Sequence, residues 1–251
     1  GYGTQKRTSV TGAISSVSSE EISVQPVVNI GQALQGRVAG VTVVNNGAPG
    51  AAPIVRVRGV GTVNNANPLY VIDGFPTGDL NSINPKDIES LEVLKDASAA
   101  AIYGSRAGNG VILITTKRGT NKKLSVNLDS YYGVERPWRT LDLLNNPQYI
   151  DYATELLVNS GASIPPRIAT GLDQPINSTT SQTFRQTNTD WQEEMFQTAP
   201  IQQHKVELMG GSEKSKVFAS FGYFDQEGIM KGTGYRRGDA RLNSDHEISK
   251  R

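Results

Sequence analysis

From Leu124 onward, apolar and polar residues alternate along the chain, and this alternation restricts the fold more than any other feature. The first such segment sorts into two faces: Leu124, Val126, Leu128, Tyr132 and Val134 against Ser125, Asn127, Asp129 and Glu135. A period of two residues is that of a β-strand. The pattern returns at 205–208, 217–223 and 239–243, so about four amphipathic strands are expected. Such strands are typical of membrane β-barrels, but a soluble antiparallel sheet alternates in the same way, so both folds stay open on this pattern.

Residues from about 8 to 120 have a different texture, in which short apolar segments alternate with short helices around many glycines. After an apolar start at 14–17, strands are expected at 41–44, 54–57, 69–72, 91–94 and 111–116. Helices are expected from Asn29 to Gly40, from Asn84, and over Ala97–Tyr103. These elements predict a small mixed sheet with short helices packed on it.

The segment from Pro137 to Pro200 interrupts the strand pattern. It contains one expected helix, capped at Asn146 with Pro147 next to it, and then a stretch rich in Ser, Thr, Gln and Pro. A connection of this length is usually functional or disordered.

Composition excludes several classes of protein. The 251 residues include no cysteine and carry a formal net charge of +1, without a basic block that would favour nucleic acid. Neither His204 nor His246 has carboxylates at ligand spacing, so no metal site is predicted. No apolar run reaches the roughly 18 residues of a membrane helix, and no secretory signal opens the chain. The loop 104–110 lacks the Gly-Lys-Ser/Thr ending of a phosphate-binding loop, and no catalytic constellation or cofactor site is predicted.

Five ordered motifs carry a resemblance to a known family. They are Gln32–Gly40 (QALQGRVAG), Val55–Gly59 (VRVRG), Pro68–Gly74 (PLYVIDG), Ile88–Arg106 (IESLEVLKDASAAAIYGSR) and Gly110–Gly119 (GVILITTKRG). In this order they closely resemble the plug of SusC-like (RagA-type) TonB-dependent receptors, the glycan and peptide importers of Bacteroidota. The resemblance covers the plug almost entirely and continues more loosely through Thr189–Trp191 and Ser220–Gly228.

The resemblance implies an α+β plug domain at 1–120, followed at 121–251 by the first antiparallel strands of an incomplete transmembrane β-barrel. The segment 137–200 would be a long extracellular loop. The implied function is TonB-dependent import of a glycan or oligopeptide across the outer membrane of a Gram-negative bacterium, with the plug facing the periplasm and gating the lumen. Implied partners are a SusD-like surface lipoprotein, TonB, membrane lipid and the substrate; no enzyme activity is implied. Because the TonB-contacting segment and most barrel strands are missing, the chain is expected to be a fragment.

The resemblance also directs attention to particular side chains. Four charged residues of the plug, Arg56, Arg58, Glu92 and Arg106, are candidates for contacts with the lumen wall, since buried charges need partners. The alternative for Arg56 and Arg58 is that they are solvated strand residues. Asn64, Asn65 and Asn67 lie in a polar loop between two strands and are candidate substrate contacts, because amides donate and accept hydrogen bonds. The alternative is that asparagine is there for turn geometry.

Two other functions stay open beside glycan or peptide import. A siderophore or cobalamin receptor would share the plug, but the Pro68–Gly74 and Asp96–Arg106 motifs resemble the SusC branch more closely. A secreted, soluble binding or adhesion module with a plug-like fold belongs to a different class, and the cell fraction that holds the protein would distinguish it.

Overall fold

The computed structural model describes residues 14–23, 28–62, 65–78, 83–96 and 101–248. The chain forms two compact units. The first contains residues 1–133, 200–228 and 233–251, and the second contains residues 134–199 and 229–232. The α/β residues and most of the alternating strands therefore belong to one unit, and the predicted division at residue 120 remains a prediction.

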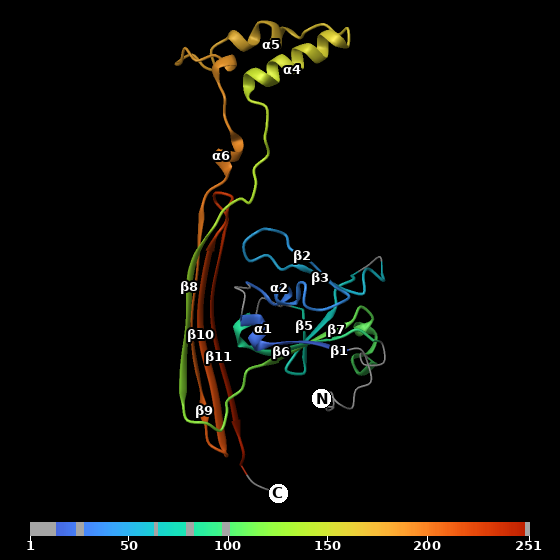
Figure 1. Cartoon of the computed structure of the whole chain (residues 1–251), viewed down its shortest axis with the longest axis vertical. Helices are drawn as coiled ribbons and strands as arrows, with labels where there is room; N and C mark the ends of the chain where they lie inside the picture. Colours follow the sequence, from blue (N-terminus) through green and yellow to red (C-terminus); the bar gives the residue numbers. More distant parts are fainter. Residues whose placement is uncertain (1–13, 24–27, 63–64, 79–82, 97–100, 249–251) are drawn as a thin grey trace. The chain divides into compact units, whose positions relative to one another are not determined.

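The α/β part of the first unit is built on a five-stranded mixed sheet (Figure 1). Its strand order is β1 (Ile14–Ser18), β6 (Ile88–Leu94), β7 (Val111–Thr116), β4 (Leu69–Ile72) and β5 (Phe75–Thr77). The β4–β7 pair is parallel and the other three pairs are antiparallel. A separate antiparallel ribbon joins β2 (Val41–Val44) to β3 (Ile54–Val57). The small mixed sheet predicted from the sequence is confirmed.

A two-residue turn places Asp73 at the end of the central strands. β4 and β5 are joined by Asp73 and Gly74, whose φ angles of 49° and 90° are both positive, as a tight hairpin of this length requires. The Asp73 carboxylate accepts hydrogen bonds from the Thr116 backbone N–H (3.0 Å) and hydroxyl (2.6 Å) at the end of β7. The turn is thereby fixed to β7.

The short helices differ in length from their predictions. Asn29 caps α2 (Ile30–Leu34) as predicted, and its side chain accepts a hydrogen bond from the Gln32 N–H. The predicted extension to Gly40 is wrong, because Gly36 has a φ of 72° and ends the helix four residues earlier. Asn84 starts only the 3₁₀ turn η2 (Pro85–Asp87), since β6 begins at the next residue. Of the helix expected at 97–103, residues 97–100 lie outside the described residues, and η3 (Ala101–Ala107) follows.

The core of the α/β part lies between this sheet, the β2–β3 ribbon and the helices α1 (Ser19–Ser23) and α2. Its buried members are Val17, Ile22, Ile30, Ala33, Leu34, Val38, Val55, Val57, Tyr70, Ile83, Ile88, Leu91, Val93, Ile112 and Ile114. Burial raises the pKa of Tyr70 to about 12, and the nearby Arg56 opposes this rise only partly. The α/β part therefore has an apolar core of its own.

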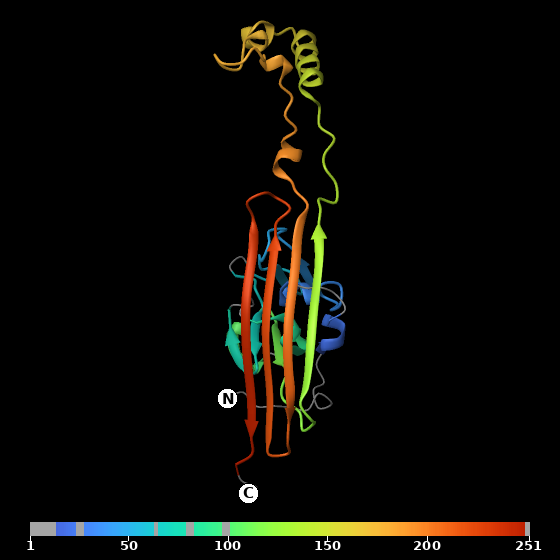
Figure 2. The ribbon, with the colours of Figure 1, turned by 90° about the vertical axis from the view of Figure 1, so that its left-hand side faces the viewer.

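The alternating segments form a four-stranded antiparallel sheet in the order β11, β10, β9, β8, as expected (Figure 2). The strands are β8 (Ser125–Glu135), β9 (Ala199–Gly211), β10 (Ser215–Glu227) and β11 (Gly234–His246). β10 pairs with both neighbours without a register shift. Among the described residues, no helix has the length and apolar character needed to cross a membrane.

The second unit contains α4 (Asn146–Asn159), α5 (Pro166–Ala169), η4 (Gly171–Asp173), η5 (Phe184–Gln186) and α6 (Trp191–Met195). The helix predicted after Pro137 is α4, but Asn145, and not Asn146, is its cap, through a reciprocal pair of bonds with Gln148. The Asn146 amide instead donates to the carbonyls of Phe184 and Thr187, which ties the helix start to the returning chain.

Candidate functional site

The two faces of the four-stranded sheet differ in both polarity and burial. Its exposed face carries apolar side chains: Val126, Leu128, Val217, Phe221, Tyr223 and Leu242. Its other face carries most of the sheet's buried polar side chains, Gln203, Lys205, Glu207, Ser220 and Gln226, together with the buried rings of Phe218 and Phe224. A sheet of a water-soluble protein has the opposite arrangement, with apolar residues buried and polar residues in water.

The polar face is buried because the α/β part packs against it within the first unit (Figure 1). Contacts come chiefly from two short segments of the α/β part, residues 84–87 and 116–118. They are neighbours because Ile88, the first residue of β6, pairs with Thr116, the last residue of β7. One end of the central β6–β7 hairpin is thus fixed to the four-stranded sheet.

Lys205 on β9 is the most deeply buried charge in this contact. Its side chain is 0% exposed, and its ammonium lies 2.8 Å from Asp87 Oδ1 and 2.7 Å from Glu207 Oε1. The same Glu207 oxygen accepts a 2.9 Å hydrogen bond from Lys117 Nζ. Asp87 and Lys117 belong to the α/β part, whereas Lys205 and Glu207 belong to the sheet, so the ion pairs cross the contact in both directions.

Arg241 on β11 extends this group of charges. Its guanidinium lies 3.9 Å from Asp87 Oδ2 and 3.8 Å from Asp73 Oδ2, and it donates to the Thr116 hydroxyl at 3.3 Å. Three cations therefore face three anions: Lys117, Lys205 and Arg241 against Asp73, Asp87 and Glu207. We call these six residues the charge cluster.

The charge cluster is balanced only when both parts are together. The α/β part supplies two anions and one cation, and the four-stranded sheet supplies two cations and one anion. Removing one partner of a buried ion pair leaves a desolvated charge and typically costs about 3–5 kcal/mol. The cluster therefore fixes the position of the α/β part on the sheet.

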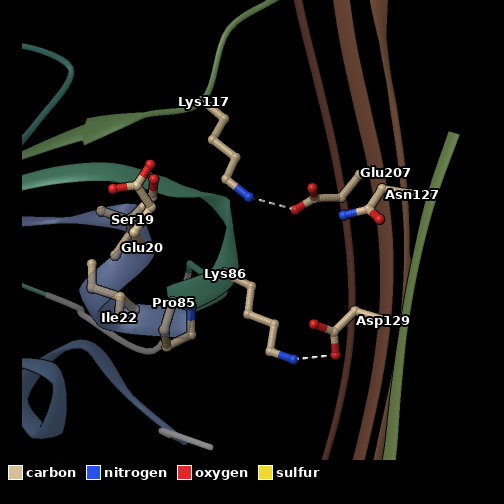
Figure 3. A pocket seen from close by; sticks show the side chains of 10 residues that line it. Ser19, Glu20, Ile22, Pro85, Lys86, Lys117, Asn127, Asp129 and Glu207 are labelled. Carbon is tan, nitrogen blue, oxygen red and sulfur yellow. Dashed lines mark hydrogen bonds and ion pairs between the residues drawn. The ribbon is translucent and has the colours of Figure 1, made fainter. Parts of the chain in front are cut away.

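A pocket of about 200 Å³ lies beside the charge cluster (Figure 3). It is bordered by α1, by η2 and by β8 and β9, and Figure 3 shows the Lys117–Glu207 and Lys86–Asp129 ion pairs across it. Lys86 Nζ also lies 5.6 Å from the centre of the Tyr131 ring on β8. Each of these two lysines is neutralised by a carboxylate of the sheet.

β11 makes further polar contacts with the α/β part. The Asn243 amide donates to the Lys117 carbonyl at 2.7 Å, and Arg118 forms a 3.0 Å ion pair with Asp245. Both members of the Arg118–Asp245 pair are about half exposed, so this pair contributes little to stability. The charges around Lys205 are buried more deeply than those of this pair.

Of the four charged residues predicted to contact the lumen wall, Arg56 and Arg58 have partners within the α/β part. Arg56 donates to Asn67 Oδ1 at 2.5 Å, and Arg58 forms a 2.5 Å ion pair with Asp96; all four residues belong to the α/β part. Glu92 is partly buried in β6, between β1 and β7, and Arg106 is exposed in η3. A role for these four charged residues at another part of a wall remains a prediction.

Asn64 lies outside the described residues. The Asn65 side chain accepts the Asn67 N–H at 2.9 Å, which is a turn-forming bond, and Asn67 accepts from Arg56. Asn109 donates to the Asn65 carbonyl, so the loop is joined to the start of β7. Substrate contact by these asparagines remains a prediction.

Sequence reasoning missed the charge cluster, although a signal was present. Lys205 and Glu207 lie on the polar face of an alternating strand, and a charged face opposite an apolar one is what the inside of a barrel wall requires. Their partners across the contact, Asp87 and Lys117, occupy an ordinary helix-start position and the residue after a strand. Which of these charged residues form ion pairs depends on how the α/β part packs against the four-stranded sheet.

Comparison with known proteins agrees with this arrangement. Residues 6–111 match the family model described as TonB-dependent Receptor Plug Domain. The chain is 42% identical to TonB-dependent receptor P26 of Formosa agariphila, over 99% of the chain and 25% of that protein. It is 37% identical to TonB-dependent receptor SusC of Bacteroides thetaiotaomicron, over 97% of the chain and 24% of that protein. The chain thus spans about a quarter of the length of these relatives.

A solved structure gives the same result for the fold. The structure titled RagAB peptide transporter superposes with a TM-score of 0.83 at 32% identity, over 96% of the chain and 29% of that structure's chain. The sequence alignments with three siderophore receptors cover only 43% of the chain. The chain belongs to the SusC-like TonB-dependent receptors, outer-membrane proteins of which it carries the plug and adjoining antiparallel strands. This is a family of receptors and not an enzyme class.

Proposed function

We propose that this chain is part of a TonB-dependent importer that carries a glycan or an oligopeptide across the outer membrane. In this proposal the α/β part is the plug, and β8–β11 are a sector of the barrel wall. The plug closes the lumen until energy from TonB displaces it. A SusD-like surface lipoprotein is the proposed partner for substrate capture, and the plug faces the periplasm.

The observation that carries the proposal is the inverted polarity of the four-stranded sheet. Its polar face is buried against the plug through the charge cluster, and its opposite face exposes Leu128, Phe221 and Leu242. An exposed apolar face on antiparallel strands suits contact with lipid, and a polar inner face suits a lumen that holds a removable plug. A soluble adhesion module has no use for this arrangement.

The charge cluster also fits a plug that must move. Ion pairs and hydrogen bonds in a polar contact can be exchanged for water, whereas a large apolar contact would resist separation. The small plug sheet and its own apolar core allow the plug to stay partly folded when these contacts break. Asn65 and Asn67 remain candidate substrate contacts, and Arg56, Arg58, Glu92 and Arg106 remain candidate contacts to other parts of the wall.

Deleting the gene that encodes the chain tests the function. Growth should be lost on one class of polymer, either a glycan or a peptide digest, and retained on the corresponding monosaccharide or amino acids. Loss of growth on iron-limited medium alone would favour the siderophore alternative. Recovery of the native protein from the soluble fraction after cell breakage would exclude the importer.

A further inference from the structure

Besides the charge cluster, the plug contacts the four-stranded sheet at Asn84. This residue is 2% exposed although its side chain is polar. Its Oδ1 accepts the Lys86 N–H at 3.0 Å, which caps η2. Its Nδ2 donates to both carboxylate oxygens of Asp239 on β11, at 3.1 and 3.2 Å. One amide thus shapes the plug turn and bonds the sheet at the same time.

The amide reaches Asp239 because β10 has no side chain at this place. Gly222 pairs with Asp239 across the β10–β11 ladder and with Lys205 across the β9–β10 ladder. A methyl group on Gly222 would lie 2.6 Å from Asp239 Oδ2 and 2.9 Å from Asn84 Nδ2. Real side-chain carbons do not approach other atoms so closely, so alanine here would require the contact to shift. Gly222 does not have a positive φ, so space, not backbone conformation, requires the glycine.

Asp239 is itself held in place by a neighbour on its strand. Arg237 Nε lies 3.3 Å from Asp239 Oδ1, and Arg237 Nη1 donates to the Val28 carbonyl of the plug at 3.1 Å. The Arg237 guanidinium also lies 5.8 Å from the centre of the Phe224 ring on β10. The acceptor for Asn84 is therefore held by contacts of its own.

We propose that Gly222 provides the gap that positions the closed plug, with Asn84 inserted into it and bonded to Asp239. Asn84, Gly222 and Asp239 act as positioning residues, and the charge cluster beside them supplies the attraction. A methyl group at 222 would push the Asn84 amide and the Asp239 carboxylate apart. Because each of these groups is held by a further bond, we expect the plug turn to shift with the amide and the closed lumen to leak. This inference depends on the proposed function only in assuming that the plug closes a lumen.

The test uses the full-length receptor in the outer membrane and measures sensitivity to vancomycin, an antibiotic too large for ordinary porins. Gly222→Ala should lower the inhibitory concentration several-fold. Gly238→Ala is the matched control. Gly238 directly precedes Asp239 on β11, and a methyl group added to it would have no atom within 4 Å. The control should leave sensitivity unchanged.

A second substitution separates the gap from a general folding defect. Asn84→Ala shortens the inserted side chain, so the Asn84→Ala, Gly222→Ala double variant should recover most of the resistance that Gly222→Ala loses. Unchanged resistance in Gly222→Ala, or no recovery in the double variant, would overturn the inference. Growth on the substrate is measured separately, so failed import with the predicted leak would count against the proposed function alone.

Discussion

The two faces of the four-stranded sheet obey opposite rules. On one face, Lys205 and Glu207 are buried and paired with charges of the plug. On the other, Phe221 is 57% and Leu242 is 71% exposed, with no covering element among the described residues. Neither face is therefore expected to contact water, because one contacts protein and the other is proposed to contact lipid.

The largest loss of stability is expected from a substitution on the buried face. Lys205→Ala would leave Asp87 and Glu207 close together without their common cation, and removal of one partner from a buried ion pair costs about 3–5 kcal/mol. Denaturant unfolding of the receptor in detergent measures the change. Lys214→Ala, in the exposed turn of the same hairpin, is the control and should be nearly neutral. Equal stability of the two variants would show that the buried face does not depend on its ion pairs.

A charge on the opposite face should also be costly, but only in lipid. Phe221→Arg places a guanidinium on the exposed apolar face, and such a change costs about 2–4 kcal/mol near the bilayer centre. The cost is measured as the free energy of folding into lipid vesicles, with Phe221→Leu as the apolar control. A cost below that of the control would show that this face meets water.

The plug core provides a third environment, in which charge is not accommodated. Burial raises the Tyr70 pKa to about 12, above its ordinary value of 10.0. The unfolded chain therefore releases this proton first as the pH rises. The stability contribution is fully present below pH 10 and is lost between pH 10 and about 12, a loss of about 2–3 kcal/mol. Tyr70→Phe should lose less stability over this range; identical pH profiles would contradict the burial argument.

The smallest effect is expected at the exposed rim of the contact. Arg118→Ala removes a half-exposed ion pair with Asp245, which is worth about 0–1 kcal/mol. Salt should abolish even this difference. A loss similar to that of Lys205→Ala would mean that burial does not determine the strength of these pairs.

Local patterns predict much of the fold. The strand Val111–Thr116 is predicted to the residue, since a β-branched apolar run between glycines favours a buried strand. The predicted end of α2 is wrong because Gly36 and Gly40 both have positive φ angles, and the sequence does not say which one terminates the helix. Alternation likewise sorts Lys205 and Glu207 onto one face without naming their partners.

The candidate site is less accessible to sequence reasoning. Wall contact by Arg56 and Arg58 remains a prediction, and the motif does not name the partners that the structure gives them, Asn67 and Asp96. Contact between Asn84 and Asp239 joins residues 155 positions apart and depends on the missing side chain of Gly222. Such contacts follow from the packing of two parts, which residue spacing within either part does not encode.

If the two faces of β10 lie in different media, site-directed spin labelling should distinguish them residue by residue. Single cysteines at positions 219, 220 and 221, in a cysteine-free background, would be spin-labelled in the receptor in lipid vesicles. We expect fast relaxation by oxygen at 219 and 221, and little collision with either oxygen or a water-soluble nickel complex at 220. Collisions with the nickel complex at 219 and 221, at the level of a water-exposed loop, would contradict the assignment of this face to lipid.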